Sequence, residues 1–179
     1  MLLWKVDRGP LHPQRNLGQT ARKRRFIMAN SAPQCPKKVL VLCLGNSDRS
    51  PLVAAVLQTF LNQTGQGATC ESVGIDDAAK GGGSAAFASV KAAKRLGIDL
   101  SAHKKRHVSE VDLSTYDLFV VMTDEIAGKV VELRGGNRTN VFNVDVTNPW
   151  PVQFQEDFDI CMPKILGAAY LVVQRYYMP

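Results

Sequence analysis

The first chemical feature of this sequence is a cysteine and an arginine, Cys43 and Arg49, separated by five residues. That spacing lets a single loop hold a sulfur atom at its floor and a guanidinium group at its rim. A guanidinium binds two phosphate oxygens bidentately, and a thiolate is a strong nucleophile. Together the two residues predict a phosphate-binding loop whose thiolate attacks the phosphorus of a phosphomonoester.

The flanking residues predict the elements that must position this loop. Lys38 to Cys43 is a continuous apolar run, typical of a strand that is buried on both faces. Gly45 and Asn46 tolerate left-handed backbone, so the turn can bring several N–H groups to one point, where they bind an anion. Ser50 suits an N-cap and Pro51 a first helical position. The positive end of the helix would then face the sulfur and favour its ionisation below the ordinary pKa of about 8.5.

The loop resembles the signature of the low-molecular-weight protein tyrosine phosphatase family. The resemblance implies that Cys43 forms a phosphocysteine, that Arg49 binds the equatorial phosphate oxygens, and that Ser50 hydrogen-bonds the thiolate. The alternative is a buried structural cysteine with an unrelated arginine, which the strand, turn and helix context disfavours. The residues that match the signature are Leu44, Gly45, Asn46, Arg49, Ser50 and Pro51; Ser47 and Asp48 complete the predicted phosphate-binding loop.

The resemblance continues from residue 38 towards the C-terminus. Residues 71–74 and 97–103 are similar to two further family segments, and Ser72 and His103 would support the phosphate loop. His103 would be a buried histidine that bonds the loop near Asn46. The alternative is a partly exposed loop histidine within a solvated basic run. The resemblance implies neither a metal nor a cofactor.

Two residues depart from the family pattern, and the first concerns the general acid. The family has Asp, Pro and an aromatic residue after the fourth strand, whereas this chain has Asn148, Pro149 and Trp150. An amide cannot donate the proton that the leaving oxygen needs, and general acid catalysis is worth about 10²–10⁴-fold. Asp145 could substitute if the loop rearranges, and Trp150 is expected to form a wall of the substrate cleft or to pack in the core.

The second departure is Asp48, where many eukaryotic family members have another cysteine. A carboxylate there would repel a phosphate dianion unless it points outward or pairs with a cation. Arsenate reductases of related fold also have a cysteine at this position. An arsenate reductase would need a resolving cysteine pair, which the sequence after Cys70 does not offer, so this function is disfavoured.

Composition and charge restrict the remaining possibilities. The chain has 179 residues, 45% of them hydrophobic, and no apolar run reaches the roughly 18 residues of a membrane span. Its four cysteines show no metal-binding spacing, and a reducing cytoplasmic setting is expected. Residues 1–38 hold nine of the 22 basic residues and one of the 16 acidic residues, which leaves 13 basic and 15 acidic for the remainder. The core therefore offers no basic face for nucleic acid.

The basic N-terminal segment is expected to lie outside the folded domain. Residues 1–37 lack apolar periodicity, contain four prolines and include the cluster Arg22–Arg25, a composition typical of disorder. Residues 1–27 permit a transit peptide or a nuclear signal, or they are an extension upstream of a start at Met28. The domain prediction is therefore a basic extension over residues 1–37 and a phosphatase-like domain over residues 38–179.

From residue 38 the pattern alternates between strands and helices. This alternation predicts an α/β fold with three α/β/α layers, a four-stranded parallel sheet in the flavodoxin-like order 2-1-3-4, and a ligand site at the carboxyl ends of the strands. The segment from Ser84 to Leu96 is expected to be a helix with Phe87, Val90 and Ala93 inward. The expected strands are residues 38–43, 68–74, 116–122 and 139–144, and the other expected helices start at Ser50, at Asp124 and near Pro163.

The sequence thus favours a slow, monomeric cysteine phosphatase acting on phosphotyrosine proteins or small aryl phosphates. The main alternative is a catalytically silent relative that binds phosphorylated ligands or anions. Cys43, Arg49 and Ser50 favour the enzyme, whereas Asp48 and Asn148 favour the binding protein.

Overall fold

A parallel sheet of four strands forms the centre of the fold in the computed structural model, which describes residues 35–148 and 158–178. The strand order is β2-β1-β3-β4, and the pairings are all parallel, as the sequence predicts. The strands are β1 (Lys38–Cys43), β2 (Thr69–Gly74), β3 (Leu118–Val121) and β4 (Val141–Asn143).

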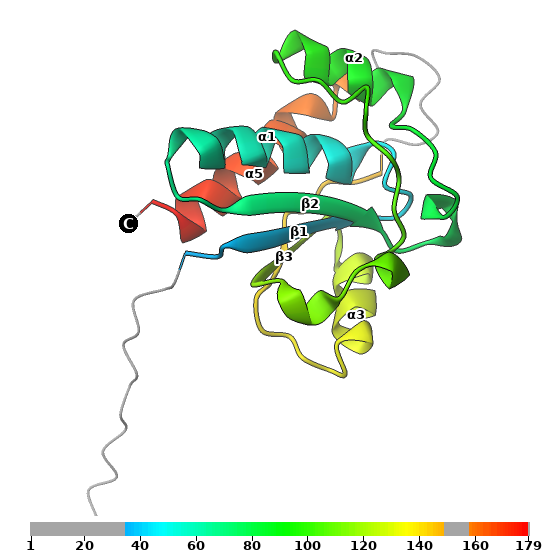
Figure 1. Ribbon diagram of the computed structural model, residues 1–179, viewed down its shortest axis with the longest axis vertical. Coiled ribbons are helices and arrows are strands. Elements are labelled where there is room, and N and C mark those ends of the chain that lie inside the picture. The colour runs from blue at the N-terminus through cyan, green and yellow to red at the C-terminus, as the bar shows by residue number, and fades with distance from the viewer. Residues whose placement is uncertain (1–34, 149–157, 179) are drawn as a thin grey trace, which may run out of the picture. The chain divides into compact units, whose positions relative to one another are not determined.

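Helices cover both faces of this sheet, which confirms the predicted three-layer arrangement. Figure 1 shows α1 and α5 together on one face and α3 on the other. The helices are α1 (Arg49–Gln63), α2 (Phe87–Arg95), α3 (Asp124–Leu133) and α5 (Met162–Tyr176), and three short 3-10 segments cover Asp77–Ala79, Val108–Glu110 and Leu113–Thr115. None of the described helices is long and apolar enough to cross a membrane.

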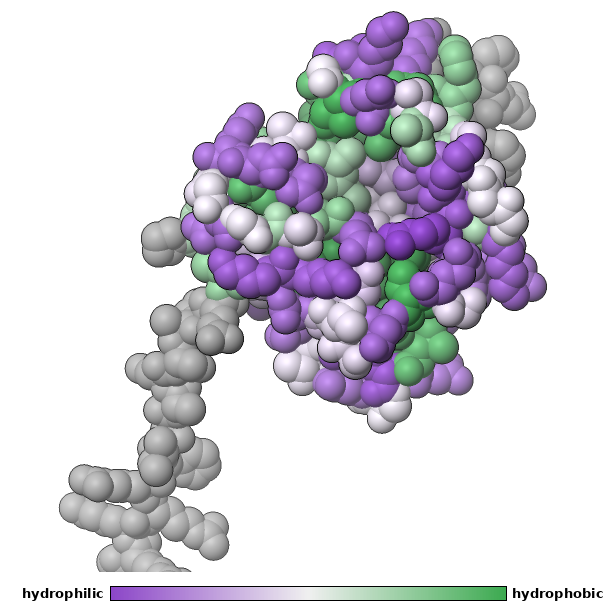
Figure 2. All heavy atoms as spheres, in the orientation of Figure 1, coloured by the Kyte–Doolittle hydropathy of each residue, from purple (hydrophilic) through white to green (hydrophobic). Residues whose placement is uncertain are grey.

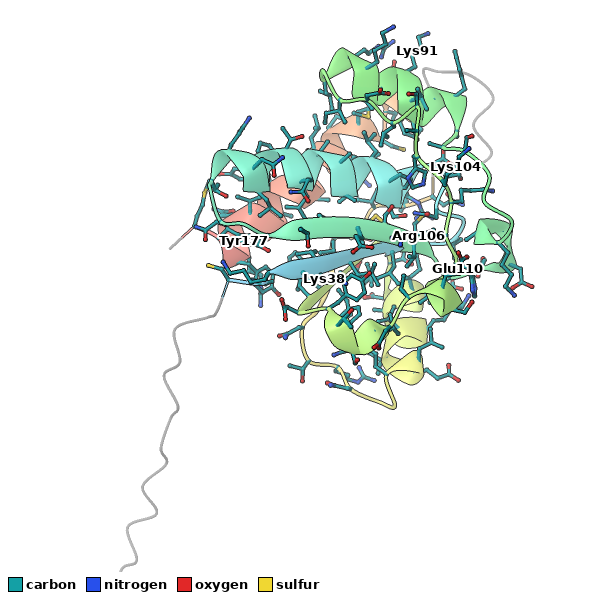
Figure 3. The ribbon with its side chains drawn as sticks, viewed as in Figure 1. Lys38, Lys91, Lys104, Arg106, Glu110 and Tyr177 are labelled. Carbon is teal, nitrogen blue, oxygen red and sulfur yellow. The ribbon has the colours of Figure 1, made fainter. Side chains whose placement is uncertain are left out.

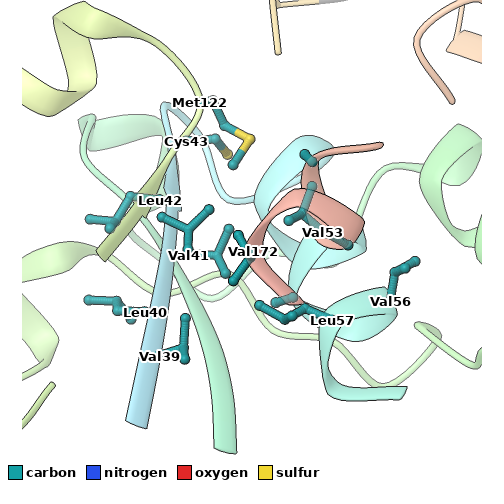
Figure 4. Close-up of a cluster of buried hydrophobic side chains, with 14 of the residues drawn as sticks. Val39, Leu40, Val41, Leu42, Cys43, Val53, Val56, Leu57, Met122 and Val172 are labelled. Carbon is teal, nitrogen blue, oxygen red and sulfur yellow. The ribbon is translucent and has the colours of Figure 1, made fainter. Parts of the chain in front are cut away.

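Strand β1 lies in the middle of the sheet and in the middle of the core. Its residues from Val39 to Leu42 are fully buried, and Figure 4 shows Val53, Leu57 and Val172 packed near them. Burial on both faces explains why β1 is apolar without alternation. Because β1 ends at Cys43, the thiol stands at the carboxyl edge of a rigid strand.

Two local predictions about helix starts are wrong. Helix α1 begins at Arg49, so Ser50 and Pro51 lie inside its first turn and Ser50 is not the N-cap. Helix α2 begins at Phe87 rather than Ser84, because Ser84 pairs with Lys104 in an isolated bridge and Ala86 is extended. Phe87 is 80% exposed and not inward, since it occupies the first turn, whereas Ala93 in the last turn is fully buried.

The folded region includes residues just upstream of β1. Tyr177 Oη donates to the Pro36 carbonyl oxygen (2.6 Å), and the Lys37 N–H donates to Asp117 Oδ2 (2.8 Å). Two hydrogen-bonded residues, Pro36 and Lys37, therefore precede the predicted boundary between residues 37 and 38. The predicted extension over residues 1–34 lies outside the described residues.

The segment after α2 runs along the outer edge of β2 and is fastened there. The Gly74 N–H donates to the Arg106 carbonyl oxygen (2.8 Å), and the Arg106 guanidinium pairs with Glu71 on β2 (2.7 Å). Figure 3 shows Arg106 and Lys38 on this side of the sheet. Hydrophilic side chains cover most of this face, with smaller hydrophobic patches between them (Figure 2).

Gly74 at the end of β2 allows the loop after β1 to approach closely. A Cβ atom at this position would lie 2.5 Å from the Leu44 carbonyl oxygen and 2.9 Å from the Asn46 backbone nitrogen. Contacts this short with backbone atoms cannot be relieved by a side-chain rotation. Only glycine therefore fits at this position without displacing the loop.

We expect Gly74→Ala to lower the free energy of unfolding by about 2–3 kcal/mol, because overpacking forces backbone shifts. Urea denaturation measures this change. Gly128→Ala in α3 is the matched control: nothing lies within 4 Å of the place that its methyl group would occupy, and removing a helical glycine should stabilise by about 0.5–1 kcal/mol. Equal stabilities for the two variants would contradict the close approach.

Candidate active site

A small pocket opens at the carboxyl end of β1, where the sequence predicts the ligand site. Its volume is about 230 Å³. The loop between β1 and α1 forms most of its wall, and one residue from the 3-10 segment after β2 and one from the segment after β4 complete it. The lining residues are Cys43, Leu44, Gly45, Ser47, Asp48, Arg49, Ala78 and Asn148.

The Cys43 sulfur is held by two groups that can donate hydrogen bonds to it. The Asn46 backbone N–H donates to Sγ (3.3 Å), and Ser50 Oγ lies 3.0 Å from the same sulfur. Ser50 Oγ accepts a hydrogen bond from Asn46 Nδ2 (3.0 Å), so its own proton can be donated to the sulfur at 3.0 Å or to the more distant Val73 carbonyl oxygen (3.4 Å). Donors in this arrangement stabilise negative charge on a thiolate.

Asn46 is the hydrogen-bonding centre of the loop. It is fully buried and adopts a left-handed conformation with φ of 52°, whereas Gly45, also expected to need such freedom, does not have a positive φ. Its side-chain nitrogen also donates to Ser72 Oγ (2.9 Å), and its side-chain oxygen accepts from the Arg106 N–H (3.0 Å). The side-chain amide therefore joins the loop to α1, to β2 and to the segment along the edge of β2.

His103 holds the same residue from its backbone side. Its Nε2 lies 3.0 Å from the Asn46 carbonyl oxygen, so this nitrogen carries a proton and donates it. Burial lowers the pKa of His103 below its usual 6.5; the hydrogen bond to Asn46 acts in the opposite direction, and the charge of Arg106 adds to the lowering. The ring is half-buried, between the two alternatives that the sequence left open.

Arg49 is a buried cation at the pocket wall. It is 2% exposed, and its Nη1 donates to the Val146 carbonyl oxygen (2.9 Å). Burial lowers its pKa, while the nearby Cys43 and Asp48 act in the opposite direction. The guanidinium thus lies beside the thiol, with its orientation fixed by the segment that follows β4.

That segment also positions Asn148. Val146 is fully buried, and its N–H donates to the Met122 carbonyl oxygen (2.8 Å) while its own carbonyl accepts from Arg49. Asn148, two residues later, lines the pocket. Asp145 is exposed, has a φ of 51° and is not among the lining residues, and Trp150 lies outside the described residues.

Asp48 lines the pocket and is held by two hydroxyl groups. Ser47 Oγ donates to Asp48 Oδ2 (2.7 Å), and the hydroxyl of the fully buried Ser89 of α2 is shared between the Asp48 carbonyl oxygen (3.3 Å) and Oδ1 (3.4 Å). The sequence did not indicate Ser89, Val146 or Ala78 as parts of the site, since each reaches it only through the tertiary fold. Among the described residues, no cluster of three or more His, Cys, Asp or Glu side chains could hold a metal.

A parallel α/β sheet with a buried thiol and a buried arginine on the loop after β1 is the arrangement that the sequence predicts for a cysteine phosphatase. A family model described as low molecular weight phosphotyrosine protein phosphatase matches residues 38–170. The chain therefore belongs to this family of phosphatases, and its fold is that of a family hydrolase. A search among curated protein sequences finds no significant match.

Solved structures of this family are similar over most of the chain. Wzb of Vibrio vulnificus in complex with benzylphosphonate is 27% identical, with a TM-score of 0.69, covering 78% of this chain and 99% of that one. The low molecular weight protein tyrosine phosphatase of T. tengcongensis is 22% identical, with a TM-score of 0.69 and coverage of 77% and 98%. The YwlE arginine phosphatase of Geobacillus stearothermophilus is 19% identical, with a TM-score of 0.67 and coverage of 78% and 92%.

We expect Asn46→Ala to lower the free energy of unfolding by about 3 kcal/mol, because it leaves several buried polar groups without partners. It should also weaken binding of inorganic phosphate, measured by calorimetry, by at least about tenfold. Asn140→Ala is the matched control, since Asn140 also has a positive φ, of 60°, but is exposed. If Asn140→Ala lowered the free energy of unfolding as much, backbone strain alone would explain the effect of Asn46→Ala.

The lowered pKa of His103 predicts a pH dependence of stability. The unfolded chain binds the His103 proton below about pH 6.5, while the folded chain binds it only at lower pH. Stability should therefore be complete above pH 6.5 and fall as the pH drops below it. Urea denaturation at several pH values between about 5 and 7.5 measures this slope. His103→Gln, which keeps an N–H donor, should reduce the slope, and an unchanged slope would contradict the assignment.

Proposed function

We propose that this protein is a cysteine-dependent phosphomonoester hydrolase that acts on phosphotyrosine or small aryl phosphates. Cys43 attacks phosphorus, and Arg49 binds the equatorial oxygens. Ser50 stabilises the thiolate that forms again when the phosphocysteine is hydrolysed. The observation that carries the proposal is the pair of contacts to the Cys43 sulfur, from the Asn46 N–H (3.3 Å) and Ser50 Oγ (3.0 Å), in a pocket that Arg49 also lines.

Turnover is reduced because the pocket has an amide where the family has its general acid. Asn148 lines the pocket but cannot protonate a leaving oxygen, and Asp145 is exposed and does not line it. Esters with good leaving groups lose least, since an aryl oxygen departs more easily as an anion than an alkyl oxygen does. This dependence favours aryl over alkyl phosphates as substrates.

The second candidate is a silent protein that binds phosphorylated ligands without cleaving them. The same residue, Asn148, favours it, because anion binding needs the loop and Arg49 but no acid. The names of the structural neighbours do not decide between substrates, as one is a tyrosine phosphatase and another an arginine phosphatase. The benzylphosphonate bound to the Vibrio vulnificus protein is compatible with an aryl ligand.

Hydrolysis of phenyl phosphate by the wild type, Cys43→Ser and Asn148→Asp tests the proposal. We expect slow wild-type turnover, none with Cys43→Ser, and a gain of about 10²-fold or more with Asn148→Asp, the contribution typical of a general acid. The gain should be larger for phenyl phosphate than for 4-nitrophenyl phosphate, whose leaving group needs less protonation. Wild-type turnover no higher than that of Cys43→Ser would leave the binding function, which phosphate calorimetry would then measure.

A further inference from the structure

The side chain of Lys105 is held beside the pocket by contacts that do not neutralise its charge. Its Nζ donates to the Ala78 carbonyl oxygen (2.9 Å), and its backbone N–H donates to the Gly83 carbonyl oxygen (2.7 Å). Gly83 also makes room for this side chain, because a Cβ atom at position 83 would lie 2.7 Å from Lys105 Cε. The ammonium group is therefore fixed against the loop between β2 and α2.

This loop is in turn attached to the phosphate-binding loop. The backbone N–H groups of Ile75 and Asp76 both donate to the Leu44 carbonyl oxygen (2.9 and 3.1 Å). Ala78 lies two residues further on; it lines the pocket and is exposed, so it belongs to the rim of the pocket. Since Lys105 bonds the carbonyl of Ala78, its ammonium group is one residue away from this rim.

The acidic side chains of the same loop pair with other lysines. Asp76 pairs with Lys129 (3.3 Å), and Asp77 pairs with Lys80 (2.6 Å). Lys105 forms no ion pair with any of the described residues. An ammonium group has three protons to donate, and the bond to Ala78 uses one of them. The rim of the pocket thus carries a positive charge that the fold positions but does not compensate.

A ligand whose phosphate group enters the pocket leaves its neighbouring residues outside the rim. We propose that Lys105 forms a carboxylate subsite there, which selects phosphorylated ligands with acidic side chains next to the phosphorylated residue. This inference rests on the proposed function only in that an aryl phosphate must enter the pocket, and it does not require cleavage of the ester. Ion pairs at an exposed surface strengthen binding by up to about fivefold.

Calorimetry with two peptides tests the subsite on the full chain. Both peptides contain phosphonomethylphenylalanine, an uncleavable mimic of phosphotyrosine, flanked on each side by two glutamates in one peptide and by two glutamines in the other. We expect the wild type to bind the glutamate peptide about threefold more tightly at low ionic strength. This preference should disappear in about 1 M salt, where the Debye length falls to about 3 Å.

Lys105→Met removes the charge and keeps an unbranched side chain against Gly83. It should abolish the preference by weakening binding of the glutamate peptide about threefold, with binding of the glutamine peptide unchanged. Lys104→Met is the matched control, because it removes the same net charge from the neighbouring residue. Lys104 is exposed and lines a separate cavity against α1 and β2, so this variant should keep the preference.

Gly83→Ala moves the charge without removing it. The φ of Gly83 is not positive, so alanine suits the backbone, and the flexible side chain of Lys105 must shift to admit the methyl group. We expect this variant to reduce the preference to less than about twofold although the net charge is unchanged. It also tests the subsite if Lys105→Met does not fold.

The outcomes separate the subsite from the proposed function. Equal binding of the two peptides by the wild type overturns the subsite and leaves the hydrolase intact. A preference that survives in Lys105→Met overturns it, and so does an equal loss in Lys104→Met, since net charge would then explain the preference. Equal weakening of both peptides in Lys105→Met also overturns it, because Lys105 would then only hold the rim in shape. If the preference depends on Lys105 but phenyl phosphate is not hydrolysed, the subsite stands and the hydrolase does not. Failure to bind either peptide overturns both.

Discussion

The buried amide of Asn46 is the interaction on which the rest of the site depends. One left-handed residue gives its backbone N–H to the Cys43 sulfur and its side-chain nitrogen to the hydroxyls of Ser50 and Ser72. A buried polar group is costly unless every donor and acceptor finds a partner. Because these partners come from α1, from β2 and from the segment after α2, the loop adopts its shape only when the sheet and α1 are assembled around it.

The electrostatics of the pocket follow from this assembly. A cation and a thiol, Arg49 and Cys43, are both nearly inaccessible, at 2% and 3% exposure. Burial lowers the pKa of Arg49, and the nearby Cys43 and Asp48 oppose this lowering only in part. Asp48 adds a carboxylate near Arg49. A phosphate in this pocket would therefore meet a carboxylate as well as hydrogen-bond donors.

Local patterns predicted much of this fold because they coincide with what the core requires. The apolar run of β1 and the helix from Asp124 to Leu133 have the expected bounds, the latter because Thr123 caps it and Gly135 and Gly136 follow it. The candidate loop was recognisable from the sequence because its residues are adjacent in the chain.

Features that depend on distant partners were not accessible to such patterns. Arg49 bonds Val146, 97 residues away, and Ser89 bonds Asp48 across 41 residues. From the sequence alone Gly74 resembles an ordinary strand end, because the loop that packs against it is not adjacent in the chain. Ser50 resembles a cap because its type fits one, but its hydroxyl is directed to the sulfur instead. Phe87 fits the apolar spacing of a buried face, but it is the first residue of α2 and its side chain is 80% exposed.

The anchoring of Val146 has a consequence for the pocket residue that follows it. Its two backbone bonds, to Met122 and to Arg49, hold the residues that follow at a fixed place relative to the phosphate loop. A side chain at position 148 is therefore presented to the pocket by a backbone that is anchored two residues earlier, whatever that side chain is.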